Sequence, residues 1–530
     1  MHQCLGIQEI LSSIAENLRY GWLNGRVVSN EDTVTHHRDI EDLAVFARTC
    51  RAFHGPAVRA LWHVQDTLDN LMKILPPETW KVRGSVEDPV RMFTLTRPIK
   101  QHEWKRFTYY ASLIRTLHID SGSTENMSWS PSVLTALCLH RNSEGTDLLP
   151  NLRNLRVSEY CWDKSANDQV AVLLGRSLKT IEISPENGGD DWAPALLGYL
   201  PSSCPDMESV NFRGCQTLPP NIIEDWPLWD GLRCFRCDAF VSIGSCLRLL
   251  KLPKLRDLSI GISQGEDGKS SPPLPLQIIS HALTNLELRI KRAPCALKLL
   301  GRCNFPVLRN INLSVDDARL LATYITTLHD RCEPDLLRSF KILSEDQPSS
   351  GHSIPTHLIS QLLRFKNLQE VDISTLPLLI DDTTLHDMAT AWPQLAKLRM
   401  PHHEADPLAI PRITLVGLIP LAQQCPKLEE LQISLNFAAP PRAIHNLPGH
   451  GLSDSQLQTI EVHGSDLRSS CTWVAGFLSG IFPKLKIITS KTHRNKWDRV
   501  TTALKVFNAV RKQERKAFTE HCRMDPDETT

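Results

Sequence analysis

The sequence lacks an excess of charge of either sign, because 59 Lys and Arg residues balance 59 Asp and Glu residues over 530 positions. That balance argues against a general binder of nucleic acid or of anionic membrane surfaces. No stretch approaches the roughly 18 apolar residues of a membrane-spanning helix. The start of the chain lacks the basic residues of a signal peptide, and Gln8 and Glu9 interrupt its apolar run. We therefore expect a soluble protein of the cytoplasm, the nucleus or both.

The sequence also lacks a disulfide framework. Its 15 cysteines are spread over a long chain, whereas disulfide-rich domains are short secreted ones. Glutathione keeps thiols reduced in the cytosol, so we interpret these cysteines as reduced core residues.

Enzyme motifs fail on their context. Gly261–Gly265 has the Gly-x-Ser-x-Gly pattern of a nucleophile elbow around Ser263, and it follows a predicted strand. That chemistry needs a helix immediately afterwards, but residues 266–273 have the composition of a surface loop. Gly268–Ser270 is similar to the end of a phosphate loop, yet Ser263 stands where its first glycine should be. The sequence therefore predicts no enzyme and no cofactor.

Metal sites are disfavoured by spacing. Cys234 and Cys237 lie three residues apart on a predicted strand, so their side chains should point to opposite faces. The run His402–Glu404 has no second cluster at ligand spacing, which favours a polar loop.

What the sequence does contain is a phrase, apolar-x-x-apolar-x-apolar, that recurs about every 28 residues along its last four-fifths. Each copy predicts one short strand. The copies begin at Ile114, Leu152, Leu178, Met207, Leu232, Leu255, Leu283, Leu308, Leu337, Leu368, Leu395, Leu428, Leu457 and, in a worn form, Leu485.

Proline marks the junction before many of these strands. Seven prolines stand two positions before the first apolar residue of a copy: Pro150, Pro205, Pro253, Pro306, Pro393, Pro426 and Pro483. Proline cannot continue a helix, and it favours extended backbone in the residue before it. Each unit is therefore predicted to be a helix followed by a strand. One unit of this length buries too little apolar surface to be stable alone, so the units must stack into an α/β solenoid.

The repeats resemble leucine-rich repeats. That family usually has Asn or Cys three residues after the last strand position, and here only Cys215 and Asn436 fit. We therefore expect irregular repeats that form a horseshoe.

The first sixty residues have another pattern. Ile10, Leu11, Ile14 and Leu18 share one helical face, and Ile40, Leu43, Ala44 and Ala47 share another. Gly55 and Pro56 suggest the cap and first residue of a third helix that contains Ala57, Ala60 and Leu61. These three short helices are too small to form a stable domain without a partner.

This region resembles an F-box. The resemblance rests on Ile7–Leu11, on the run Asp42–Phe53 with its Leu-Ala-x-x-Ala-Arg-Thr-Cys-x-x-Phe pattern, and on the closing Leu61-Trp62. Gln8 stands where the family usually has proline, and residues 19–38 separate the two halves as a looped insertion. An F-box followed by leucine-rich repeats resembles the substrate receptors of SCF-type cullin-RING ubiquitin ligases, which are widespread in fungi.

The resemblance implies that the F-box helices bind the small adaptor subunit of the ligase, while the repeats hold a protein substrate. The implied adaptor-binding residues are Ile7, Ile10, Leu11, Ile14, Leu43, Cys50, Phe53 and Trp62. Packing within the three helices uses the same residue types, and it remains the alternative for each of them. The other reading of the whole chain is a non-catalytic interaction scaffold that takes no part in ubiquitination.

Strand alternation nominates the substrate-binding residues. When the apolar positions point into the core, the residues between them face the concave surface of the horseshoe. The candidates are Asn154, Arg156, Asn211, Arg213, Glu287, Arg289, Glu370, Asp372, Lys397 and Arg399, and the same rule also selects Ser158, Ser209, Asn285, Glu430 and Gln432. For any one of these positions, a solvated strand residue is a commoner outcome than a substrate contact, so the candidate is the surface as a whole.

Four segments complete the predicted organisation. The F-box covers 1–66, a helical and aromatic linker that caps the solenoid covers 67–112, the repeats cover 113–490, and a capping helix with a tail covers 491–530. In the last segment Trp497, Val500, Leu504, Phe507 and Val510 share one helical face. The basic run 511–516 that follows is interpreted as a solvated helix end, with a nuclear signal as the alternative.

Overall fold

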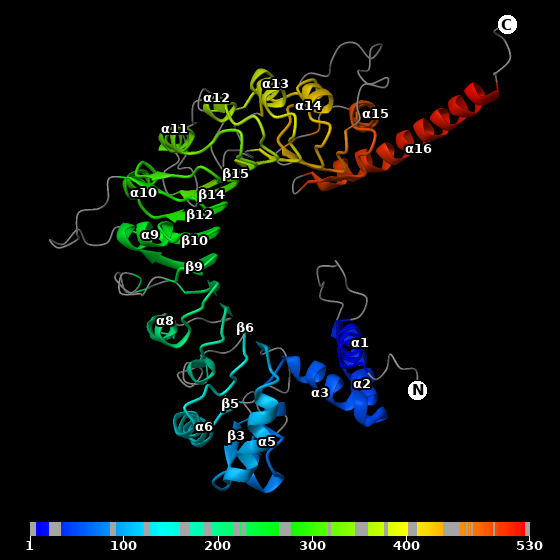
Figure 1. Ribbon diagram of the computed structural model, residues 1–530. Coiled ribbons are helices and arrows are strands. Elements are labelled where there is room, and N and C mark those ends of the chain that lie inside the picture. Colours follow the sequence, from blue (N-terminus) through cyan, green and yellow to red (C-terminus); the bar gives the residue numbers. More distant parts are fainter. Residues whose placement is uncertain are drawn as a thin grey trace. The chain divides into compact units, whose positions relative to one another are not determined.

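The computed structural model describes residues 7–20, 33–84, 92–120, 128–158, 170–184, 192–215, 218, 223, 229–263, 277–315, 320–344, 359–375, 380–400, 411–437, 455–462, 465, 467, 470–490 and 493–524. The chain divides into two compact units, Met1–Ala239 and Phe240–Thr530. Both units are built mainly from parallel strands and helices (Figure 1).

The first unit begins with three helices, α1 (Gln8–Tyr20), α2 (Thr33–Thr49) and α3 (Arg51–His63), which pack against one another. Ala15, Leu43 and Ala60 form one small buried cluster between them. Ala47 and Ala57 belong to a second cluster, against which Trp62 and Tyr110 pack. Small residues at these positions let the helices approach closely, which explains how so short a segment forms a core at all.

Two details of this region differ from the sequence-based expectation. The predicted looped insertion at 19–38 is helical at both ends, through Tyr20 and from Thr33, and residues 21–32 lie outside the described ranges. Helix α3 begins at Arg51, so Pro56 lies inside the helix and does not start it. Proline has no backbone N–H, so the carbonyl of Ala52 loses its helical donor, one turn after the helix begins.

The segment predicted as a helical and aromatic linker is only partly helical. Besides α4 (Asp69–Met72), a 3₁₀ turn (Pro77–Thr79) and α5 (Gln101–Ala111), it contributes two strands to a small sheet. The strands of that sheet are β2 (Trp80–Arg83), β3 (Met92–Leu95) and, from farther along the chain, β5 (Ser128–Trp129). Helix α6 (Pro131–Glu144) follows, and Trp104 of α5 stacks on His140 of α6 at 3.9 Å between ring centroids.

The repeats of the first unit form a parallel ladder. Its strands are β1 (Val64–Gln65), β4 (Thr116–Asp120), β6 (Asn154–Ser158), β7 (Thr180–Ser184), β8 (Ser209–Phe212) and β9 (Cys234–Val241). The second apolar position of the phrase stays in register, with Leu117 opposite Leu155, Leu155 opposite Ile181 and Ile181 opposite Val210. Helix α8 (Trp192–Ser203) belongs to the same unit.

The second unit continues the phrase in a longer ladder. Its strands are β10 (Asp257–Ile262), β12 (Asn285–Ile290), β14 (Asn310–Val315), β15 (Ser339–Ser344), β16 (Glu370–Asp372), β17 (Lys397–Arg399), β18 (Glu430–Ile433), β19 (Thr459–Val462) and β20 (Ile487–Thr489). Neighbours pair in parallel without a shift, so that Val371 faces both Phe340 and Leu398. A separate two-stranded parallel sheet is formed by β11 (Ile278–Ile279) and β13 (Cys303–Asn304). In the sequence, β11 falls between β10 and β12, and β13 falls between β12 and β14.

Helices follow these strands along the chain and line one side of the ladder (Figure 1). They are α9 (Ile243–Leu250), α10 (Ala293–Leu300), α11 (Leu321–Arg331), α12 (Ile359–Leu362), α13 (Asp382–Ala391), α14 (Leu418–Gln424) and α15 (Cys471–Ile481). The order of helix, turn with proline, and strand is the predicted one, as in α13, Pro393 and β17. Both units are therefore α/β solenoids of stacked repeats, as predicted.

A recurring pair of hydrogen bonds fixes the start of most strands in the two ladders. The carbonyl of the residue just before one strand accepts two backbone N–H groups from the next repeat. Arg309 O, for example, accepts from Arg338 N at 2.7 Å and from Ser339 N at 3.0 Å. We call this the strand-start position. Because its backbone is tied to the neighbouring repeat, its side chain leaves the ladder from the same place in each copy.

The core between strands and helices is apolar and contains most of the described cysteines. All fourteen residues that begin a copy of the phrase are buried. The buried thiols are Cys204, Cys215, Cys237, Cys246, Cys295, Cys303, Cys332 and Cys425. Burial raises the pKa of Cys425 to about 12, and that of Cys332 likewise. These side chains behave as small hydrophobic groups.

The second unit ends in the long helix α16 (Arg494–Met524), which packs against α15 and β20. Trp497, Val500 and Leu504 are buried, whereas Val510 is 45% exposed. The apolar face predicted from the sequence is thus used over its first half. Lys512 and Lys516, in the basic run, are exposed on the helix. Among the described residues, none of the helices combines the length and the hydropathy that a bilayer crossing requires.

Candidate functional site

One face of each ladder carries polar side chains because strand residues alternate between core and surface. Along β6, Leu155 and Val157 are buried while Asn154 and Arg156 are exposed. The predicted alternation holds in both units, and we call the polar side the exposed strand face. Parallel strands lie about 4.8 Å apart, so equivalent side chains on neighbouring strands come within reach of one another.

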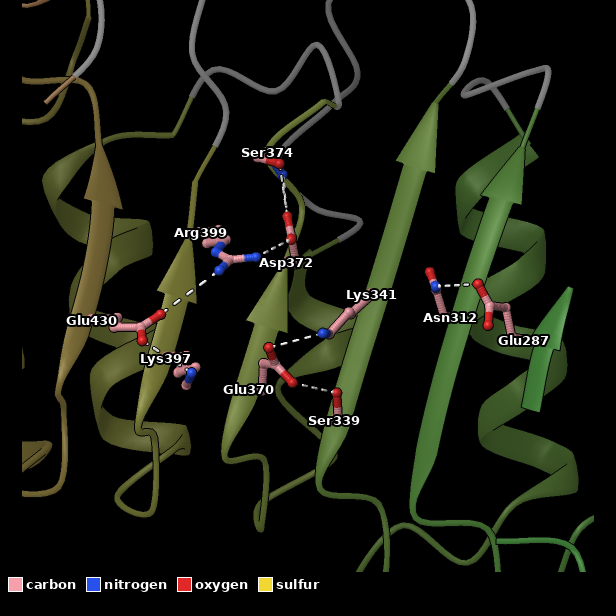
Figure 2. A network of polar contacts seen from close by, with 10 residues as sticks. All are labelled: Glu287, Asn312, Ser339, Lys341, Glu370, Asp372, Ser374, Lys397, Arg399 and Glu430. Carbon is pink, nitrogen blue, oxygen red and sulfur yellow. Dashed lines mark hydrogen bonds and ion pairs between the residues drawn. The ribbon is translucent and has the colours of Figure 1, made fainter. Parts of the chain in front are cut away.

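In the second unit four predicted residues meet on β16 and β17 (Figure 2). The register places Glu370 opposite Lys397 and Asp372 opposite Arg399. Arg399 lies 3.4 Å from Asp372 and 3.7 Å from Glu430. Lys397 Nζ lies 3.0 Å from the same Glu430. Acidic and basic side chains on these strands therefore neutralise one another.

Lys341 of β15 forms a second group of contacts beside the first, with Glu370 of β16 (Figure 2). Its ammonium lies 2.9 Å from Glu370, which also accepts a hydrogen bond from the hydroxyl of Ser339 at 3.1 Å. The pairs are half-exposed, so solvent screens them and each contributes about 0.2–1 kcal/mol to stability. Such pairs can exchange partners with a bound surface at small cost, which suits recognition better than folding.

Asp372 differs from the prediction that it faces solvent. It is only 6% exposed, because Arg399 and the turn at Ser374 cover it. Its Oδ1 accepts from the Ser374 hydroxyl at 2.7 Å and from the Ser374 amide at 3.2 Å. Strand β16 ends at this residue, so the carboxylate fixes the turn that follows. Asp372 therefore holds Arg399 and the turn at Ser374 in place, and its own side chain is not available to contact a partner.

Glu287 and Arg289 lie together on β12. The exposed Glu287 accepts a hydrogen bond from the side-chain amide of Asn312 on β14 at 3.1 Å (Figure 2). Arg289 is two residues farther along the same face and is half-buried. These two candidates are thus brought near their strand neighbours, but no described contact joins them to the cluster on β16 and β17.

The first unit has its own polar group around Glu182. Arg156 lies 3.7 Å from this carboxylate, and the amide of Asn211 donates to it at 3.2 Å. Asn154 donates instead to the hydroxyl of Thr116 at 3.2 Å. Arg213 follows the end of β8 and is exposed.

Two central residues, Glu182 and Lys341, escaped the sequence-based choice. Both occupy the polar position between two apolar strand residues, as in Ile181-Glu182-Ile183. The same alternation that selected the other candidates would have found them, had it been applied to every copy of the phrase.

The chemistry of this face is non-covalent. It offers paired charges, amides and hydroxyls on a rigid ladder, which suits an extended partner rather than a small reactant. Among the described residues no group of three or more His, Cys, Asp and Glu side chains is arranged to hold a metal ion. Cys234 is half-buried and Cys237 is buried on β9. Ser263 directly follows β10, whereas residues 264–276 and His402–Glu404 lie outside the described ranges.

The three N-terminal helices split the implied adaptor-binding set in two. Leu11 and Leu43 are 2% and 0% exposed, and Leu43 belongs to the small core between the helices. Ile10 of α1 is 38% exposed, and Ile7, the residue just before this helix, is 47% exposed. Val45 of α2, which the sequence did not single out, is 58% exposed. The helices therefore satisfy their own core and still present apolar side chains.

The remaining members are half-buried. Phe53 stacks on Phe46 with ring centroids 4.5 Å apart, and Trp62 packs against Tyr110 at 4.7 Å. Ile14 lies one helical turn after Ile10, and Cys50 stands between α2 and α3. Each of these four has part of its surface in the helix packing and part in solvent.

Comparison with known proteins adds little to this geometry. No family model matches the chain, and no curated protein matches it. Among solved structures, an internalin (inlF) of Listeria monocytogenes is 11% identical, with 79% of this chain and 87% of that chain covered and a TM-score of 0.30. The leucine-rich-repeat-containing protein LegL7 of Legionella pneumophila is also 11% identical, with 66% and 96% covered and a TM-score of 0.30. The repeats are therefore defined by the two parallel ladders and not by these similarities.

Proposed function

We propose that this chain is the substrate-recognition subunit of an SCF-type ubiquitin ligase, in which the N-terminal helices dock the adaptor and the repeats bind a protein substrate. The observation that carries the first half is the exposure of Ile7 and Ile10 beside a core already closed by Leu11 and Leu43. Exposed apolar side chains on a small helical bundle are typical of a docking surface. The resemblance of the run Asp42–Phe53 to an F-box supports the ligase adaptor as the partner.

The second half of the proposal rests on the exposed strand face. Its charges are paired, accessible and mounted on a rigid ladder, as in Lys341, Glu370 and Lys397. Stacked repeats provide an extended surface, and extended surfaces suit macromolecular partners. The chain itself performs no chemistry in this role, and it presents one protein to another.

The test is co-expression of the full chain with the ligase adaptor, followed by size-exclusion chromatography. The expected result is a one-to-one complex. The informative variant is Ile10→Glu, which places a charge on the exposed apolar stripe of α1 and should abolish co-elution. Desolvating an unpaired carboxylate in an apolar interface costs several kcal/mol, or more than about a hundredfold in affinity.

Ser13→Glu is the matched control, since Ser13 is an exposed polar residue of the same helix and the variant adds the same charge. It should retain the complex. Leu11→Asp serves a different purpose: it disrupts the helix core, so loss of binding in that variant alone would not locate the interface. Retained binding in Ile10→Glu with unchanged circular dichroism would refute the docking face.

The alternative is a scaffold that uses its repeats without an adaptor. Cys50, Phe53 and Trp62 are half-buried, and the two aromatic rings already pack against other rings of the first unit. This packing favours the scaffold, because it leaves less of their surface for an adaptor. Absence of any complex between the well-folded full chain and the adaptor would support it.

A further inference from the structure

A row of arginines stands at the strand-start positions of the second unit. Arg256, Arg309 and Arg338 precede β10, β14 and β15, and Thr284 takes the equivalent place before β12. All three arginines are exposed. They stand where their strands begin, and none of them belongs to the network of Figure 2.

The backbone holds this row in fixed register. Arg256 O accepts from Thr284 N and Asn285 N, both at 2.9 Å, and Thr284 O accepts from Arg309 N at 2.9 Å and Asn310 N at 3.0 Å. The same pair of bonds joins Arg309 to the Arg338 repeat. With strands about 4.8 Å apart, the row from Arg256 to Arg338 spans about 14 Å. The three guanidinium groups are therefore mounted side by side on a rigid support.

In the first unit, basic side chains at the strand-start position are neutralised by a carboxylate. There Glu208 stands between Lys179 and Arg233 in the row, and its carboxylate lies 2.6 Å from the lysine and 3.8 Å from the arginine. In the second unit Thr284 stands in the corresponding middle place. Within the described residues, no ion pair engages Arg256, Arg309 or Arg338. The row thus keeps its cationic charge in a protein whose net charge is zero.

We infer that this arginine row binds a carboxylate-rich peptide segment of a partner protein. Guanidinium groups match carboxylates in geometry and form charge-assisted hydrogen bonds with them. The charge is spread over four strands, so it complements several single charges along an extended chain better than one concentrated charge. The inference does not depend on adaptor docking.

The experiment uses the full chain alone and a fluorescein-labelled twelve-residue peptide of alternating Glu and Gly, with binding followed by fluorescence polarisation. We expect saturable binding that weakens as salt rises, and no binding of the same peptide with Gln for Glu. The decisive variant is Thr284→Glu, which rebuilds the arrangement of Glu208 by placing a carboxylate between Arg256 and Arg309. It should weaken peptide binding about tenfold, the effect of about 1.4 kcal/mol.

Two controls separate this effect from general changes. Thr284→Gln has the same size and loses the same Thr284 hydroxyl bond to Arg256 O, and it should bind like the wild type. Lys486→Glu reverses a charge at the strand-start position before β20, where the preceding repeat has Gln458, and it should also leave binding unchanged. Equal affinities for Thr284→Glu and Thr284→Gln would overturn the inference. So would an equal loss in Lys486→Glu.

The remaining arms test the class of ligand. A peptide with a single phosphoserine among neutral residues and a twelve-nucleotide single strand are compared with the Glu-Gly peptide. The inference expects the acidic peptide to bind most tightly and to be the most sensitive to Thr284→Glu. Tighter binding of the nucleotide strand or of the phosphoserine peptide, with the same sensitivity, would assign the row to that ligand and refute a carboxylate partner.

Discussion

Glu103 holds together the turn that leads into helix α5. Its carboxylate lies 2.7 Å from the guanidinium of Arg97, and it accepts a hydrogen bond from the Lys100 amide at 2.8 Å at the start of the helix. The hydrogen bond from Arg97 is the main reason that the pKa of Glu103 falls to about 2, and the Lys100 amide adds to it. The folded state therefore favours the ionised form of the Glu103 carboxylate.

The pH dependence follows from this direction. The pKa of Glu103 is lower in the folded chain, so its contribution to stability is present above about pH 4.5 and is lost as the pH falls towards about 2. The free energy of unfolding of Glu103→Gln should lie below that of the wild type at pH 7, and the difference should vanish near pH 2. Urea unfolding across this range measures it. A difference that stays the same from pH 7 down to pH 2 would contradict this role of the Glu103 carboxylate.

Helix α16 shows how an element can be anchored at one end only. Trp497 and Leu504 are buried against the rest of the second unit, and Trp497 packs on Phe437 with ring centroids 5.5 Å apart. Farther along, Arg511 donates to the carbonyl of Ser479 and Asn508 donates to the carbonyl of Leu485 at 2.8 Å. Val506 points to solvent. The interpretation of α16 as the cap of the solenoid remains a prediction that fits these contacts.

Two aspartate substitutions on α16 test how it is anchored. Leu504→Asp buries an unpaired carboxylate and should destabilise the second unit by more than about 3 kcal/mol. Val506→Asp, two residues away on the exposed side, should change stability by less than about 0.5 kcal/mol. Hydrogen exchange measured by mass spectrometry over α15, α16 and β20 separates the two. Equal protection in both variants would show that the buried face does not hold the helix.

At this scale the sequence predicted the repeats well and the irregular parts poorly. The phrase at Leu395, Leu398 and Met400 marks a buried strand because periodicity and proline point to the same boundary. The sequence does not predict the sheet of β2, β3 and β5, because these strands are short and β5 lies far from the other two in sequence. Pro56 was misplaced because proline usually begins a helix, whereas here it stands in the sixth helical position.

The candidate site divides in the same way. Alternation correctly placed Glu370, Lys397 and Arg399 on one face, because it depends only on strand geometry. It could not predict that Asp372 is covered, since the cover comes from Arg399 on the next strand and from the turn at Ser374. Nor could periodicity separate Ile10 from Leu11, because adjacent positions on a helix differ in burial only once its neighbours are known.

For the molecule as a whole, burial sorts the cysteines into reactive and protected groups. Burial raises the pKa of Cys204, Cys303, Cys332 and Cys425 to about 12, so little thiolate forms at neutral pH. Cys138 on α6 is exposed. A thiol reacts as its thiolate and only where a reagent can reach it.

Labelling with iodoacetamide at pH 7.5 and peptide mass spectrometry should therefore find Cys138 modified in the native protein. Cys204, Cys303, Cys332 and Cys425 should be modified only after unfolding in urea. Protection should be lost together for cysteines of one unit if that unit unfolds cooperatively. Rapid modification of Cys425 in the native state would contradict its place in the core.

Because of the double hydrogen bond at the strand-start position, the spacing between neighbouring strands does not depend on the number of residues in a repeat. Thr116 and Asn154 hold equivalent places 38 residues apart, Lys397 and Glu430 are 33 apart, and Asn285 and Asn310 only 25 apart. Yet all three pairs lie on adjacent strands in register. Residues can therefore be gained or lost in the connections between strands without moving the next strand. In such a ladder the loops can diversify over evolution, while the side chains on the strands keep a constant spacing.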